Sequence, residues 1–157
     1  MDKEASGFNT KQTVAIVGLG LIGGSYARGL RRLGVDHIIA VDPDEKALQQ
    51  AKQEGMVDDI YTAGTEALKQ ADLVIFCTAA DVMIRFLAEN KAFFTPGTIL
   101  TDVAGIKGDT ATAIAALLPE GVDFVPGHPM AGREGRGYAM ASADIFNGAN
   151  YILVPME

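Results

Sequence analysis

The sequence contains a single cysteine, Cys77, so no disulfide can form within the chain. This residue ends the apolar run Leu73–Cys77, a pattern typical of a buried strand. We therefore expect an inert thiol, packed as a small apolar side chain. The lack of disulfides fits a reducing compartment, and we expect the protein to be cytoplasmic.

Long apolar runs are also missing. No stretch reaches the roughly 18 consecutive apolar residues that a membrane-spanning helix needs. The first ten residues, Met1–Thr10, are of mixed polarity and lack the apolar segment of a signal peptide. We expect no membrane partner, and we expect residues 1–10 to form a disordered or tag-like tail.

An excess of positive charge is missing as well. The chain has 13 Lys and Arg against 20 Asp and Glu, which gives a net charge of −7. This balance disfavours nonspecific binding to nucleic acid or anionic lipid. The 157 residues, 48% hydrophobic and 21% charged, fit one globular domain with its own core. We assign that domain to residues 11–157.

Strand-like and helical patterns alternate along the chain, without repeats or low-complexity tracts. This alternation predicts an α/β fold with a doubly wound, mostly parallel sheet. The first helix should bury one stripe of Ile22, Tyr26, Leu30 and Leu33. Ligands of such sheets bind beyond the carboxyl ends of the strands. Strands are predicted near residues 14–17, 37–41, 73–77, 98–103, 122–125 and 151–154, with helices near 21–33, 44–54, 65–70, 81–94 and 107–118.

A glycine-rich turn follows the first strand, at Gly18-Leu19-Gly20-Leu21-Ile22-Gly23. In a strand–turn–helix setting, this G-x-G-x-x-G spacing is typical of dinucleotide binding. Gly18 allows a sharp turn, Gly20 lets a pyrophosphate approach the backbone, and Gly23 lets the helix pack on the strand. The helix that opens at Leu21 and Ile22 would present N–H groups to the phosphates.

An acidic residue, Asp42, ends the second strand about 20 residues beyond the glycine turn, where this fold places a carboxylate on the adenosine ribose. Its charge would repel a 2′-phosphate, so we expect NAD rather than NADP as the cofactor. The alternative is a βαβ unit in which the glycines only make a tight turn. In that case Asp42 would cap the helix that begins near Asp44.

Small or polar residues follow the other strands. Thr78 and Ala79 are small enough to let the cofactor lie flat, and Asp102 and Val103 end the next strand at the same edge. We include these four residues in the predicted cofactor site. No residue is singled out as a metal ligand.

Histidine is scarce, with two residues in the chain, and we expect His128 to carry the chemistry. It lies between Gly127 and Pro129 in a predicted loop, and the following proline restricts its backbone. An imidazole can take a proton from an alcohol as hydride leaves. A hydrogen-bonded structural histidine is the alternative. The other histidine, His37, starts the second strand at the opposite end of the sheet, and we interpret it as structural.

Two segments resemble a known family. They are Thr101-Asp102-Val103-Ala104-Gly105-Ile106-Lys107 and Gly127-His128-Pro129-Met130-Ala131-Gly132, followed by Glu134 and Gly137. With the glycine turn and Asp42-Pro43-Asp44, they are similar to the prephenate/arogenate dehydrogenases of tyrosine biosynthesis. The resemblance extends from Thr13 to Pro155. It implies a Rossmann-type domain that binds NAD and acts on a cyclohexadienol carboxylate.

The resemblance also implies roles for particular residues. In the family, the histidine that matches His128 polarises the ring hydroxyl while hydride passes to NAD⁺, and the ring loses CO₂ and becomes aromatic. Gly105 stands where the family commonly has a serine that helps to hold this hydroxyl. Arg133 replaces a small hydroxyl residue and would reach a substrate carboxylate, or else lie in solvent. The role of Lys107 stays open, as does the choice between prephenate and arogenate.

Family members continue into a helical domain that supplies dimer contacts and a substrate-binding arginine. We therefore expect this chain to be the cofactor domain of a homodimeric enzyme, able to bind NAD but almost inactive by itself. Two other functions stay open. One is a different hydroxyacid or imine dehydrogenase, and the other is a noncatalytic NAD-binding module.

Overall fold

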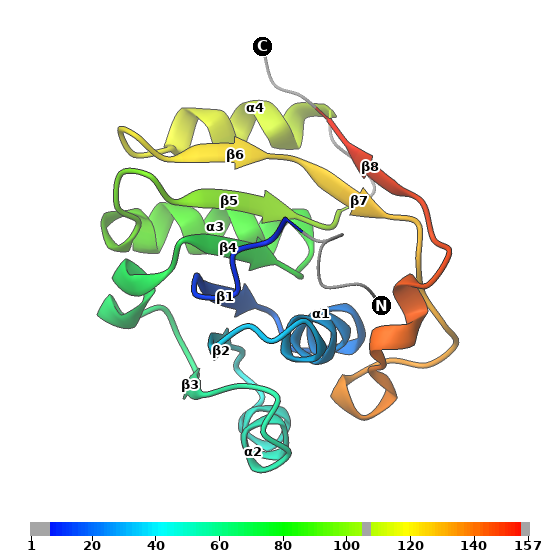
Figure 1. Ribbon diagram of the computed structural model, residues 1–157. Helices are drawn as coiled ribbons and strands as arrows, with labels where there is room; N and C mark the ends of the chain where they lie inside the picture. The colour runs from blue at the N-terminus through cyan, green and yellow to red at the C-terminus, as the bar shows by residue number, and fades with distance from the viewer. Residues whose placement is uncertain (1–6, 105–107, 155–157) are drawn as a thin grey trace.

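A six-stranded parallel sheet forms the centre of the computed structural model, which describes residues 7–104 and 108–154 (Figure 1). Its strand order is β3-β2-β1-β4-β5-β6, so the chain starts in the middle and winds outward in both directions. This is the predicted doubly wound fold. The elements are β1 Thr13–Val17, α1 Leu21–Arg32, β2 His37–Val41, α2 Glu45–Gln53, β3 Asp59–Tyr61, η1 Glu66–Gln70, β4 Leu73–Phe76, α3 Ala80–Asn90, η2 Lys91–Phe93, β5 Ile99–Asp102, α4 Gly108–Leu117, β6 Asp123–Val125, β7 Gly127–Pro129, η3 Tyr138–Met140, η4 Ala143–Phe146 and β8 Tyr151–Leu153.

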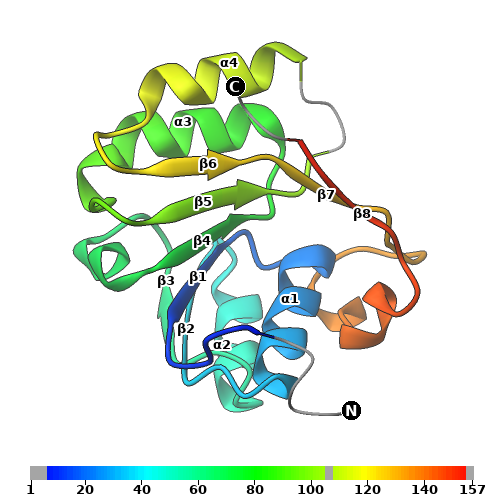
Figure 2. The same cartoon turned by 45° about the horizontal axis from the view of Figure 1, so that its top comes forward.

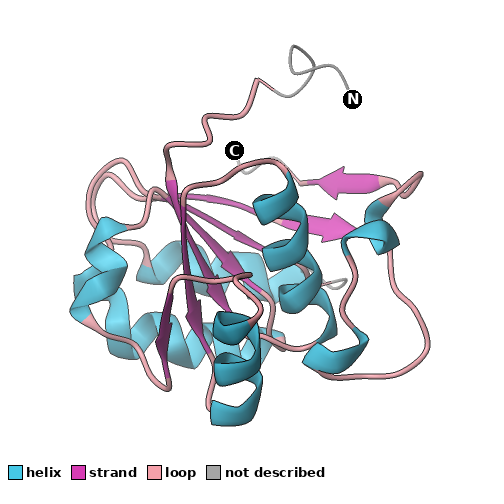
Figure 3. Ribbon diagram, turned by 60° about the horizontal axis from the view of Figure 1, so that its bottom comes forward, coloured by secondary structure: helices cyan, strands magenta, loops and turns pink. Residues whose placement is uncertain are grey.

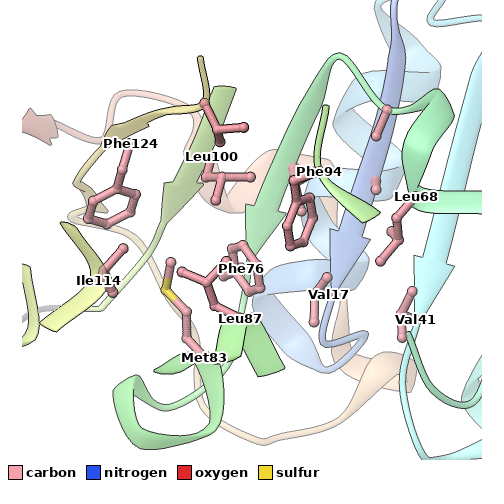
Figure 4. Packing of buried hydrophobic residues seen from close by; sticks show 14 of the residues in the cluster. Val17, Val41, Leu68, Phe76, Met83, Leu87, Phe94, Leu100, Ile114 and Phe124 are labelled. Atoms are coloured by element: carbon pink, nitrogen blue, oxygen red, sulfur yellow. The ribbon is translucent and has the colours of Figure 1, made fainter. Parts of the chain in front are cut away.

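Helices cover both faces of the sheet, α1 and α2 on one and α3 and α4 on the other (Figure 2). The central strands are therefore apolar on both sides, as expected for a parallel sheet. In β1, Ala15 faces the α3 side, while Val14 and Ile16 face the α1 side. Figure 4 shows the α3 side, where Phe76 packs with Leu87 and Phe94. Burial of each such side chain contributes about 1.5–3 kcal/mol to stability.

The buried face of α1 differs from the predicted stripe. Its buried residues are Gly23, Gly24, Ser25, Ala27 and Leu30, whereas Leu33 is 41% exposed. Close packing is the physical reason. A Cβ on Gly24 would lie 2.7 Å from the Tyr138 ring, so small side chains let another segment press on the helix. The predicted stripe was therefore right for Leu30 and for Tyr26, which packs against the core, and wrong for Leu33.

That other segment contains η3 and η4, which pack against α1. Tyr138 lies in the core, and its hydroxyl donates a 2.7 Å hydrogen bond to Glu54 at the end of α2. The Arg28 guanidinium lies 5.1 Å from the centre of the Tyr138 ring and pairs with Glu54 at 2.7 Å. Residues after the sheet are thus anchored to the first βαβ unit.

A two-stranded ribbon forms separately from the parallel sheet (Figure 3). Strand β7, Gly127–Pro129, pairs antiparallel with β8, Tyr151–Leu153, and His128 lies opposite Ile152. The sequence predicted a loop around His128, and this prediction was wrong because β8 returns across α1 to pair with it. The last strand was predicted, but its antiparallel partner was not.

The start of the described chain is also part of the fold. Phe8 packs against the α1 side of the core, and the Thr10 carbonyl accepts a 3.0 Å hydrogen bond from Asp36 N–H. The predicted disordered tail therefore does not include residues 7–10, and residues 1–6 lie outside the described part. Within residues 7–104 and 108–154, no helix is long and apolar enough to cross a membrane.

Candidate functional site

The glycine turn between β1 and α1 has a separate steric reason for each glycine. Gly18 has φ +96°, and a Cβ there would lie 2.5 Å from the Cys77 carbonyl oxygen. A Cβ on Gly23 would overlap the Gly18 carbonyl oxygen. Gly20 differs, because beyond its chain neighbours no protein atom lies within 4 Å of its Cβ position. Space is therefore left at Gly20, where the motif places a pyrophosphate.

The N-terminus of α1 suits an anion. Gly20 is its N-cap residue and offers no side-chain cap, and the first turn, with the half-buried Leu21 and Ile22, carries no acidic residue. Helix N–H groups at such an end point outward with the positive end of the dipole. A phosphate would supply the acceptors that no side chain provides.

Asp42 connects the glycine turn to the end of β2. Its Oδ2 accepts a 2.6 Å hydrogen bond from Leu19 N–H, and its Oδ1 accepts one of 2.8 Å from Asp44 N–H. Each carboxylate oxygen has a second lone pair, so the group retains capacity for ribose hydroxyls. The cap of α2 is Asp44, whose side chain accepts hydrogen bonds from Lys46 and Ala47 N–H. The alternative interpretation, in which Asp42 caps this helix, is therefore wrong, because Asp44 is the cap.

The end of β4 lies beside the turn. The methyl group of Thr78 lies 2.9 Å from the position of a Cβ on Gly18, and Thr78 Oγ1 donates to the Ala79 carbonyl at 3.1 Å. Ala79 is the exposed N-cap residue of α3. Burial and, secondarily, the charge of Asp102 raise the pKa of the partly accessible Cys77 thiol. A raised pKa keeps the thiol protonated and poorly nucleophilic.

His128 is held against the end of β5. Its Nδ1 lies 3.0 Å from the Val103 carbonyl oxygen, and the side chain is half-buried. The preceding residue, Gly127, donates its N–H to Asp102 Oδ1 at 3.1 Å. Asp102 is 2% exposed, so its carboxylate lies in the interior instead of in an open cleft. His128, Val103 and Asp102 thus form one connected group.

Arg133, another predicted site residue, lies apart from this group. Arg133 is exposed in the connection between β7 and η3. Gly105 and Lys107 lie outside the described residues. His37 lies at the opposite end of the sheet, as predicted, with Nδ1 3.2 Å from Thr13 Oγ1 and Nε2 2.6 Å from Asp59.

Sequence reasoning missed a pair of tyrosines behind the ribbon. Tyr26 on α1 donates a 3.0 Å hydrogen bond to the Tyr151 hydroxyl on β8. Burial, followed by this bond, raises the pKa of Tyr26, so its phenol stays neutral. These residues are 125 positions apart, and no local pattern connects them. The apolar run 151–154 predicted this strand but not its contact with Tyr26.

The sheet order and the glycine turn define a Rossmann-type nucleotide-binding domain, with a histidine-bearing ribbon at the carboxyl edge of the sheet. The family model for the prephenate dehydrogenase nucleotide-binding domain matches residues 26–157, and the chain belongs to this family.

Several relatives resemble the chain over most of its length. It is 34% identical to a prephenate dehydrogenase of Bacillus subtilis over 92% of this chain and 40% of the relative. It is 29% identical to a cyclohexadienyl dehydrogenase of Zymomonas mobilis over 90% of this chain and 48% of the relative. The chain therefore spans about half or less of these relatives.

Solved structures agree with this assignment. A Synechocystis arogenate dehydrogenase is 32% identical, with a TM-score of 0.84 over 92% of this chain and 50% of that chain. A prephenate dehydrogenase from A. aeolicus, in complex with hydroxyphenyl propionate and NAD⁺, is 26% identical, with a TM-score of 0.87. That match covers 97% of this chain and 53% of the A. aeolicus chain.

Proposed function

We propose that this chain binds NAD⁺ and supplies the base for oxidative decarboxylation of prephenate or arogenate. The observation that carries the proposal is the position of His128 at the same sheet edge as the glycine turn. Parallel strands β1 and β5 flank β4, so the turn after β1 and the Val103 carbonyl after β5 open at one edge. Membership of the family and the NAD⁺ complex of the A. aeolicus relative support the cofactor.

The residues present fit a dinucleotide. The open space at Gly20 and the uncapped α1 end would receive the pyrophosphate, and Asp42 would receive the ribose hydroxyls. Thr78 and Ala79 would line the path toward the nicotinamide. When bound, NAD⁺ supplies the hydride acceptor for the reaction.

The histidine side handles the proton. A carbonyl oxygen can only accept a hydrogen bond, so His128 Nδ1 donates to Val103 in the neutral ring, and Nε2 keeps its lone pair. Nε2 can then accept the proton of a substrate hydroxyl while the carbinol carbon loses hydride. Loss of CO₂ from the opposite ring carbon would then leave an aromatic phenolate, and the protonated Nε2 can return its proton to that oxygen. Arg133 would hold a substrate carboxylate, because a planar guanidinium can donate two parallel hydrogen bonds to such a group.

Exposed apolar residues on and next to the ribbon support the expectation that another domain packs against it. Met130 is 55% exposed, Ile152 46% and Leu153 60%. Patches of this kind mark contact surfaces in soluble proteins. The helical, dimer-forming domain implied by the resemblance would cover this face, and without it the chain should associate weakly at high concentration.

The test is His128→Asn in an active form of the protein. We expect kcat to fall by about 10²–10⁴-fold, the range for general acid–base groups. The dissociation constant for NAD⁺, measured by calorimetry, should stay unchanged because the ring contacts Val103 and not the glycine turn.

His37→Asn is the matched control, because His37 lies at the other end of the sheet. It should leave kcat unaltered. Retention of most of kcat in His128→Asn would show that His128 is a structural histidine and would overturn the proposal.

A further inference from the structure

We propose that the buried carboxylate of Asp102 is a positioning residue, which fixes His128 in place and selects its ring tautomer by binding the Gly127 N–H. This inference rests on the proposed function of His128 as the base. It changes the role predicted for Asp102, from direct cofactor contact to action through Gly127 and His128.

The need for such a contact arises where β5 and β6 stop pairing. Their parallel register ends at Thr101 opposite Val125, and the next residue on the β6 side is Pro126. Proline has no N–H, so the backbone ladder cannot continue through it. The Asp102 side chain takes over one residue later, where its Oδ1 accepts the Gly127 N–H at 3.1 Å. A side chain thus extends the sheet up to His128.

Burial makes this contact specific. Asp102 is 2% exposed, and a carboxylate that leaves water must be hydrogen-bonded or it destabilises the fold by several kcal/mol. A charge-assisted hydrogen bond from a backbone amide satisfies part of that demand. The position of the Gly127 amide is therefore tied to a group that cannot move to solvent without rearranging β5.

The ribbon is fixed from its other strand as well. A Cβ on Gly127 would lie 2.8 Å from the Tyr151 hydroxyl and 3.1 Å from the Asp102 carbonyl oxygen, so β7 is closely packed on both. Tyr151 in turn accepts the hydroxyl of Tyr26 on α1. Gly127 is held between β5 and β8, and His128 follows it directly.

The consequence concerns the imidazole ring. With Gly127 fixed, the His128 ring reaches the Val103 carbonyl, and only an Nδ1–H can donate to that oxygen. An unrestrained neutral imidazole prefers the other tautomer, with the proton on Nε2. The structure therefore assigns to Asp102 a role in keeping the Nε2 lone pair available for a substrate hydroxyl.

Long-range ¹H–¹⁵N NMR of the ring nitrogens tests this directly, because the chain has two histidines. A His37→Gln variant assigns the signals of His128. We expect the Nδ1–H form for neutral His128, and we expect Asp102→Ala to convert it to a mixture or to the Nε2–H form. Asp102→Asn retains an acceptor oxygen and should restore the Nδ1–H form.

Asp72→Ala is the matched control. Asp72 Oδ2 also accepts a backbone N–H across neighbouring strands, from Thr13 at 2.9 Å, but at the opposite end of the sheet. This variant should leave the His128 signals unchanged. An Nε2–H form in the wild type, or an unchanged tautomer in folded Asp102→Ala, would overturn the inference.

If Asp102→Ala does not fold, hydrogen exchange of the wild type decides. The Gly127 amide should be protected like those of β5, and exchange at the rate of an open loop would overturn the inference.

Turnover separates this inference from the proposed function. In an active form of the protein, Asp102→Ala should lower kcat by about 10²-fold, the effect of a misplaced catalytic group, and leave NAD⁺ affinity unaltered. Asp102→Asn should recover most of kcat. If His128→Asn retains activity while the tautomer still depends on Asp102, the function fails and the positioning contact stands.

Discussion

The two sides of the candidate site are built differently. On the nucleotide side, the backbone of the β1–α1 turn forms the site, and the Asp42 carboxylate accepts the Leu19 N–H from 23 positions along the chain. On the histidine side, His128 depends on contacts from β5 and, through β8, from Tyr26. The nucleotide side depends mainly on the backbone conformation of the glycine turn, whereas the position of His128 depends on contacts of individual side chains. Substitutions should therefore affect the two sides in different ways.

The largest expected effect is on the nucleotide side, from Gly20→Val. Beyond the chain neighbours, no protein atom lies within 4 Å of a Cβ at this position, so the fold should tolerate the change. The branched side chain would fill the space left for the pyrophosphate, and we expect NAD⁺ binding to be lost in calorimetry while the circular dichroism spectrum is retained.

Gly23→Val makes the comparison sharper. A Cβ at Gly23 would overlap the Gly18 carbonyl oxygen, so this variant should lose the fold itself. If folded Gly20→Val bound NAD⁺ with wild-type affinity, the turn would have only a structural role.

How far the sequence predicted each side follows from the same difference. The spacing of Gly18, Gly20 and Gly23, with Asp42 after the second strand, lies within one βαβ unit, and local patterns describe such units well. The alternation of strands and helices likewise predicted the parallel sheet. The fully apolar strands agreed with it, because strands of such a sheet are buried on both faces.

The histidine side was less predictable for a physical reason. The ribbon pairs residues 127–129 with 151–153, and neither segment shows an alternation that fixes a register. The bond between Asp102 and Gly127 spans 25 positions and depends on where β6 stops at Pro126. The small residues of α1 were informative only once Tyr138 was known to pack on them.

A second prediction concerns cofactor choice. Asp42 should make the chain prefer NAD⁺ over NADP⁺ by about 10-fold or more. The reason is that the Asp42 carboxylate would repel a 2′-phosphate with an energy of about 1–4 kcal/mol. Asp42→Asn should reduce this preference and retain an oxygen for Leu19 N–H. Calorimetry with both cofactors measures the ratio, and an equal or higher affinity of the wild type for NADP⁺ would contradict the assignment.

A third prediction compares two glycines of the same helix. Gly24→Ala should destabilise the fold by about 1–3 kcal/mol, because its Cβ would lie 2.7 Å from both Ala141 and the Tyr138 ring. Gly29→Ala should stabilise it by up to about 1 kcal/mol, because that position is open and alanine favours a helix.

Urea unfolding measures both values. Equal stability changes in the two variants would mean that the segment with η3 and η4 does not pack on α1 as described.

The smallest expected effect is the pH dependence of that same packing, through Glu54. Hydrogen bonds from Gln50 and Tyr138, together with the Arg28 guanidinium and against the effect of burial, lower the pKa of the Glu54 carboxyl from its ordinary 4.5. A carboxyl with a lowered folded-state pKa stabilises the fold above its unfolded pKa, and this stabilisation is lost as the pH falls through the folded value. The midpoint temperature of thermal unfolding should therefore decrease as the pH falls below about 4.5, and this decrease should be smaller in Glu54→Gln.

At neutral pH the same variant should lose about 0.5 kcal/mol, since the pair is partly solvated. Glu120→Gln, in an exposed turn, is the control and should reproduce the wild-type profile. Glu54 pairs with Arg28, Gln50 and Tyr138, which belong to neither side of the site, so neither NAD⁺ affinity nor the His128 tautomer should change in Glu54→Gln. A change in either would show that the anchoring of η3 to α2 is transmitted through α1 to the glycine turn or the ribbon, and that the two sides are less independent than their contacts indicate.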